Sequence, residues 1–189
     1  MHKHSITGGF IREIIFGLND GLISTLALIA GLTGAVLSNR IIILGGLAEM
    51  FAGAISMALG AYISSKSQIE YYKEEIKDAK KYKHKIFIAD EKLDLNKAEF
   101  KDPKKIALFI GIAFVLGALI PILPYFFINS LTALVISVLV SIIVLFIVGV
   151  FKVHFTYKNW FKSGIEMVVI GIVAAGIAYL IGLFFSSII

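Results

Sequence analysis

Five long apolar runs constrain this chain more than any other feature of its sequence. They lie near residues 11–37, 41–64, 105–127, 130–152 and 164–187. A helix rises 1.5 Å per residue, so about 20 residues cross the roughly 30 Å hydrocarbon core of a bilayer. Backbone groups in lipid must bond within their own segment, whereas barrel strands would be about half as long and would alternate in polarity. We therefore predict an all-α membrane protein with five transmembrane helices.

Composition supports an integral membrane protein and argues against other classes. Hydrophobic residues make up 58% of the chain and the mean hydropathy is +0.90, whereas soluble domains average about 45 to 50%. The formal charge of +5 could suggest nucleic acid, but the lysines and arginines mostly flank the apolar runs, where topology explains them. Nucleic acid is therefore not an expected partner. The chain has no cysteine, so any metal must be held by oxygen, nitrogen or thioether ligands.

Basic residues alternate between the connections and predict the orientation. Lys3 and Arg12 lie at the N-terminal end of the first run. Twelve lysines lie within residues 66–105, between the second and third runs, and three more lie within 152–162, between the fourth and fifth runs. Segments rich in lysine and arginine stay in the cytoplasm. The opposite side carries only Arg40, in an expected tight turn. The N-terminus should therefore lie inside and the C-terminus outside.

The long polar insert divides the chain into three expected parts. Residues 1–65 hold the first two helices, 66–104 form a cytoplasmic helical insert, and 105–189 hold the last three helices. The first half of the insert can continue the second helix into the cytosol. Its second half, residues 86–103, is expected to be a short loop or a helical turn.

Acidic residues of the insert repeat at helical spacing. Glu70, Glu74 and Asp78 stand at i, i+4 and i+8 and would share one face of the continued helix. That face is either a solvated surface with Glu–Lys pairs or a surface that collects cations, and the sequence leaves both readings open.

Besides Glu13 at the membrane edge, three carboxylates lie inside the apolar runs, and two of them are deep. A charged side chain at the bilayer centre costs roughly 2.5 to 3.5 kcal/mol on insertion scales, so such residues usually serve cations or protons. Helical rise places Met57 about 10 Å, Asp20 about 14 Å and Glu49 about 22 Å from the cytoplasmic surface. The sequence offers Asp20 and Glu49 no Lys, Arg or His at that depth, so they are predicted to be functional. Glu166 lies about one turn inside the interface, where functional and structural roles are equally open.

Small residues surround these side chains. One i, i+4 stripe of the second run consists of Gly45, Glu49, Gly53, Met57 and Ala61, and the stripe beside it consists of Ala48, Ala52, Ser56 and Gly60. Small-residue stripes let helices approach closely in lipid, so this face should pack against protein. Gly17, Gly21, Gly31 and Gly34 indicate the same for the first run.

The ligand types favour a borderline divalent metal. Mg²⁺ and Ca²⁺ prefer shells of oxygen alone, whereas a thioether beside carboxylates suits Fe²⁺ first, with Mn²⁺ or Co²⁺ as alternatives. Met57 also has an ordinary reading, because methionine often simply fills space between helices. Two other classes remain as alternatives: a membrane scaffold or assembly protein, and a small membrane hydrolase. The sequence contains no HExxH or nucleophile motif, so we do not expect an enzyme.

Four segments together resemble the vacuolar iron transporter family. They are GLNDGLISTLALIAGLTGA, LGGLAEMFAGAISMALGAYISSKSQ, GALIPILPY and SGIEMVVIGIVAAGIAYLIG. The resemblance covers nearly all of the chain except the insert, and AE-x-x-AGA-x-SMALG after N-D-G-L is its specific part.

The resemblance implies a homodimer of five-helix subunits that exports Fe²⁺, and often Mn²⁺, from the cytosol in exchange for protons. The metal ions are cargo, and no permanently bound cofactor is expected. The family's path residues match Asp20, Glu49 and Met57 here. A further cytoplasmic site for metal or protons is expected among Glu70, Glu74, Asp78 and Glu166. A metal channel without proton coupling is the alternative, and the membrane would be the cell membrane of a prokaryote or the vacuolar membrane of a eukaryote.

Two departures from the family concern the cytoplasmic side. Members typically carry a longer Glu-rich metal-binding domain between the second and third spans, whereas the insert here is short and as rich in lysine as in acids. Many members also place an acidic residue after the SMALG glycine, where this chain has Ala61. Glu70 or Glu74 would be the nearest substitutes for that ligand.

Overall fold

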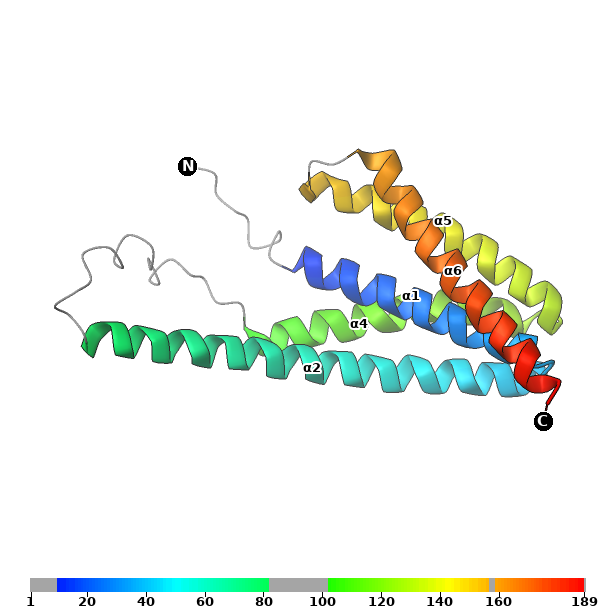
Figure 1. Ribbon diagram of the computed structural model, residues 1–189, viewed down its shortest axis with the longest axis horizontal. Coiled ribbons are helices and arrows are strands. Elements are labelled where there is room, and N and C mark those ends of the chain that lie inside the picture. The colour runs from blue at the N-terminus through cyan, green and yellow to red at the C-terminus, as the bar shows by residue number, and fades with distance from the viewer. Residues whose placement is uncertain (1–9, 82–101, 157–158, 189) are drawn as a thin grey trace.

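The computed structural model is a bundle of five long helices and describes residues 10–81, 102–156 and 159–188 (Figure 1). The helices are α1 (Ile11–Gly34), α2 (Asn39–Lys81), α4 (Pro103–Ile122), α5 (Ser130–Thr156) and α6 (Trp160–Ser186), and the short 3-10 helix η2 (Leu123–Phe126) follows α4. Each long helix contains a stretch long and apolar enough to cross a membrane. The described residues contain no strand. The prediction of an all-α membrane protein with five spans is confirmed.

Local side-chain chemistry sets several helix ends. Asp102 caps α4, since its Oδ1 accepts a hydrogen bond from the backbone N–H of Lys104 at 2.9 Å, and Pro103 occupies the first helical position. Asn159 caps α6 in the same way through the N–H of Phe161 at 3.1 Å. Val36 has a φ of 58° in the turn between α1 and α2. The expected tight turn therefore lies just before Arg40, which belongs to the first turn of α2.

Helix α1 is the centre of the bundle and packs mainly against α4 and α6. In Figure 1 it runs between α2 and the α5–α6 pair. A Cβ atom at Gly21 would overlap the carbonyl oxygen of Phe114 in α4, and one at Gly34 would overlap that of Tyr179 in α6. The first half of α1 is therefore in backbone contact with α4, and its second half with α6. The expectation that the glycines of this helix face protein is confirmed, and the protein they face is their own subunit.

The two ends of the bundle differ. We call the end from which α2 projects, and where α4 begins, the basic end, because it carries the lysines of the described segments 66–81 and 102–105. At the opposite end, the hydroxyls of Thr33 and Tyr125 are 2.7 Å apart, and Asn39 Nδ2 donates to the carbonyls of Tyr125 and Ile128 at 3.0 and 2.6 Å. These bonds fasten the end of α1, the start of α2 and η2 to one another.

Helix α2 continues far beyond the bundle, to Lys81 (Figure 1). This confirms that the first half of the polar insert prolongs the second helix. Most of its second half, residues 86–103, lies outside the described residues.

Candidate metal site

The structure brings Asp20 and Glu49 together at mid-bundle. Helices α1 and α2 run antiparallel from a shared turn, which leaves Asp20 about 21 Å and Glu49 about 15 Å along its helix from that turn. Both side chains are half-buried, and their carboxylates are close enough for the two charges to interact. Within the described part of the chain neither carboxylate has an ion pair. The pair therefore lies in the middle of the bundle without a basic side chain to balance it, and a bound cation would offset the cost of burying these carboxylates.

Two further polar side chains lie beside Asp20 on α1. The Oδ1 of Asn19 and the Oγ of Ser24 are buried and have no hydrogen-bond partner among the described residues. Ser24 stands four residues after Asp20, on the same face of the helix. Sequence reasoning missed both residues, although polar side chains inside an apolar run were a visible signal. Hydroxyl and amide oxygens are suitable ligands for a divalent cation or its water, so these atoms enlarge the candidate site.

The Glu49 stripe of α2 forms the edge of the subunit. All five of its residues, from Gly45 to Ala61, are half-buried, whereas the neighbouring stripe of Ala48, Ala52, Ser56 and Gly60 is exposed. A Cβ atom at Gly60 would meet nothing within 4 Å, whereas one at Gly53 would overlap the Phe114 ring. Within one subunit, neighbouring helices thus partly cover the stripe that contains Glu49, whereas the stripe beside it, from Ala48 to Gly60, is open.

Met57 lies at a different level and makes different contacts. It packs against a hydrophobic cluster formed by Met50, Ala54, Phe114, Ala118 and Ile122, at the contact between α2 and α4. Two helical turns, about 12 Å, separate it from Glu49. The two side chains therefore represent successive positions along α2 and not one ligand shell.

The other predicted acidic residues lie at the surface. Glu70 and Glu74 are exposed, and they pair with Lys66, at 3.8 Å between Nζ and Oε1, and with Lys77. Exposed pairs of this kind contribute only about 0 to 1 kcal/mol. Asp78 belongs to α2, but its side chain lies outside the described set, and Glu166 is exposed on α6. None of the described side chains forms a cluster of three or more His, Asp or Glu, so Asp20 and Glu49 stand as a pair.

The sequence of the chain is similar to known proteins along most of its length. Residues 11–85 and 79–183 match the model of the VIT family. The chain is 34% identical to vacuolar iron transporter 1 of Arabidopsis thaliana over 94% of its own length and 86% of that protein, and 33% identical to vacuolar iron transporter 1 of Eucalyptus grandis over 94% and 88%. It is also 32% identical to protein CCC1 of Saccharomyces cerevisiae, over 93% and 69%. The family match includes α1 and α2, which carry the two central carboxylates.

Proposed function

We propose, since this chain belongs to the VIT family, that it carries Fe²⁺ across a membrane and exchanges the metal for protons. The family is one of membrane transporters, and the relatives named above include vacuolar iron transporters. The observation that carries the proposal is the half-buried pair of Asp20 on α1 and Glu49 on α2. This pair has no basic partner among the described residues. Mn²⁺ is proposed as a second cargo, because carboxylates bind it as well.

The path is proposed to run between two copies of the subunit. One subunit supplies two carboxylates and the nearby oxygens of Asn19 and Ser24, which is few ligands for an octahedral ion. A two-fold axis beside α2 would double each ligand. The uncovered small-residue stripe of α2 supports this arrangement, because it would let a second backbone approach Glu49 closely.

We further propose the order of positions along this path. The basic end faces the cytosol, as the lysines indicate, so that Fe²⁺ would pass Met57, then Asp20, then Glu49. Glu70, Glu74, Asp78 and Glu166 are proposed to assist collection at the cytosolic side. Their role would be small where lysines already pair with them.

Proton exchange follows from the same two carboxylates. A carboxylate removed from water is costly unless a cation or a proton neutralises it. When the metal leaves, a proton would take its place on the same oxygens, so no separate proton path is required. In a eukaryotic cell the membrane would be vacuolar, and in a prokaryote it would be the cell membrane.

The test is Fe²⁺ uptake into sealed liposomes that contain the purified protein. A proton gradient with the acid inside should drive accumulation of Fe²⁺ inside, and the metal flux should acidify the outer compartment. A protonophore should abolish the gradient-driven accumulation. Metal fluxes that do not depend on proton fluxes would make the protein a channel, and an absence of metal flux would leave a scaffold role.

A further inference from the structure

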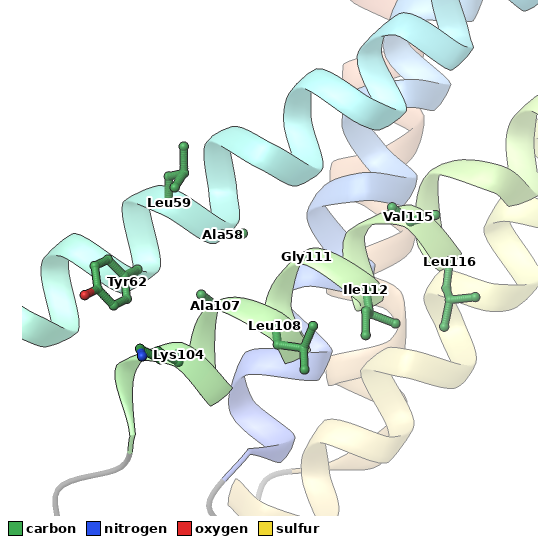
Figure 2. A pocket seen from close by; sticks show the side chains of 10 residues that line it. All are labelled: Ala58, Leu59, Tyr62, Lys104, Ala107, Leu108, Gly111, Ile112, Val115 and Leu116. Atoms are coloured by element: carbon green, nitrogen blue, oxygen red, sulfur yellow. The ribbon is translucent and has the colours of Figure 1, made fainter.

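A groove of about 590 Å³ lies between α2 and α4 near the basic end (Figure 2). Small residues, among them Ala58, Ala107 and Gly111, keep the two helices close along it: a Cβ atom at Gly111 would be 3.2 Å from that of Ala58. Larger apolar side chains such as Leu108 and Ile112 also line it and are exposed in the subunit. At one end stand Tyr62 and Lys104. The groove is therefore apolar along its length and polar only at its end.

The length of the groove corresponds to one leaflet of a membrane. Its lining on α4 extends from Lys104 to Leu116, which is about 18 Å of helix. Half of a hydrocarbon core of about 30 Å is about 15 Å. Lys104 lies in the first turn of α4, where a lysine can reach the headgroup level, and tyrosine is common at the same level. The groove thus starts at the headgroups and ends near the middle of the bilayer.

The charges around this end favour an anion. Lys104 is exposed and has no ion pair among the described residues, and Lys105 follows it. Asp102 is the nearest acidic residue in the chain, and its Oδ1 is already bonded to the backbone N–H of Lys104. Lys66, one turn beyond Tyr62 on α2, is paired with Glu70. Among the described residues that line this end of the groove, Lys104 therefore supplies an ammonium group without an ion pair.

The groove lies apart from the Asp20–Glu49 pair of the proposed metal path. Ala58 and Tyr62, one turn apart, lie on the edge of α2 that faces α4. Glu49 lies on the edge that faces α1, since Gly45, one turn before it, abuts Leu32. Leu59 also lines the groove and adjoins Gly60, so a molecule in the groove would reach that end of the exposed stripe but leave Ala48 and Ala52, next to Glu49, free for a second subunit.

We propose that this groove binds an anionic phospholipid from the leaflet at the basic end. One acyl chain lies along the apolar wall between α2 and α4, and the phosphate is held by Lys104 and the hydroxyl of Tyr62. A phospholipid matches both the one-leaflet length and the single charged end, whereas a helix of a second subunit would match neither.

The experiment measures binding of phosphatidylglycerol and phosphatidylcholine to the purified full-length protein in detergent, by native mass spectrometry. The intact protein should retain phosphatidylglycerol in preference to phosphatidylcholine. Lys104→Gln should weaken phosphatidylglycerol binding about fivefold, which is the effect of one lysine at an anionic surface, and Lys105→Gln is its matched control. Ala107→Phe, which fills the groove, should remove both lipids, whereas Leu139→Phe adds the same ring at an exposed position of α5 and should change nothing.

Three results would overturn the proposal. Equal losses for Lys104→Gln and Lys105→Gln would show diffuse attraction to a basic surface, and unchanged binding in Ala107→Phe would place the acyl chain elsewhere. The other occupant is tested with Leu108→Cys, on the α4 wall of the groove, since the chain has no cysteine of its own. A disulfide-linked dimer through that position would make the groove a contact between subunits. The melting temperature of each variant without added lipid shows that it is folded.

Discussion

Asp20 and Glu49 differ in what surrounds them. Beside Asp20 on its own helix lie the side-chain oxygens of Asn19 and Ser24, which have no hydrogen-bond partner among the described residues, whereas glycines stand one turn before and after Glu49. A buried polar atom without a partner costs about 1 to 3 kcal/mol, unless water or a cation completes its bonds. The α1 side of the pair is therefore the richer in ligands, and the α2 side leaves room for an approaching backbone.

Removing either carboxylate should strongly reduce transport without unfolding the protein. We expect Asp20→Ala and Glu49→Ala each to lower Fe²⁺ uptake into liposomes about 10- to 100-fold, because a bond to a charged group is worth about 1.5 to 3 kcal/mol. Both variants should insert and remain folded, since each loses a charge that is costly in lipid. Glu75→Ala, at an exposed acid of the projecting part of α2, is the control. Uptake at the wild-type rate in either central variant would remove that residue from the path.

A substitution at Met57 should show whether transport depends on its sulfur atom or only on its volume. Met57→Leu nearly preserves the packing against the α2–α4 cluster, so stability should fall by less than about 1.5 kcal/mol. Loss of a soft ligand should weaken transport of Fe²⁺ and Co²⁺ more than that of Mn²⁺. Uptake of the three metals by the same liposome preparation gives the ratio. An equal reduction for all three would assign Met57 to packing alone.

At the scale of the helices, the sequence predicts which segments form helices better than it predicts which helices pack against one another. The five spans followed from length and hydropathy, because lipid permits few alternatives to a helix. The continuation of α2 followed from the helical spacing of its acids and lysines. The glycines of α1 showed only that some backbone comes close; α4 and α6 supply that backbone through residues about 90 to 150 positions away, and no local signal encodes that choice. For the same reason the packing of Met57 against α4 could not be predicted.

The glycines that touch a neighbouring backbone should be the intolerant ones. Gly21→Ala would push a methyl group into the carbonyl of Phe114, so we expect a loss of about 1 to 3 kcal/mol. Gly176→Ala has open space around it and should be neutral, or stabilising by up to about 1 kcal/mol through helix propensity. Thermal unfolding in one detergent compares the two. Equal melting temperatures would mean that α1 and α4 can separate at no cost.

For the whole molecule, the proposed dimer depends both on the pair of central acids and on the exposed stripe of small residues beside it. The sequence could place Asp20 about 14 Å and Glu49 about 22 Å from the cytoplasmic surface, on either side of the bilayer middle, because helical rise fixes depth. It could not show which half of the small-residue face stays uncovered, since that depends on how α4 covers the other half. The structure leaves Ala48, Ala52, Ser56 and Gly60 exposed next to Glu49, and that is the surface on which the proposed dimer depends.

Single cysteines can test that surface directly, because the chain has none of its own. A disulfide requires Cα atoms about 4.4 to 6.8 Å apart, and helices meeting at small residues can reach that distance. Under mild oxidation in membranes, Ala52→Cys and Ser56→Cys should form covalent dimers, whereas Leu139→Cys, exposed on α5, should stay monomeric. The cross-linked dimers should also lose Fe²⁺ uptake and regain it on reduction, if the path between subunits must move. Cross-linking at Leu139→Cys alone would place the subunit contact on α5 and leave the Asp20–Glu49 pair without a partner copy.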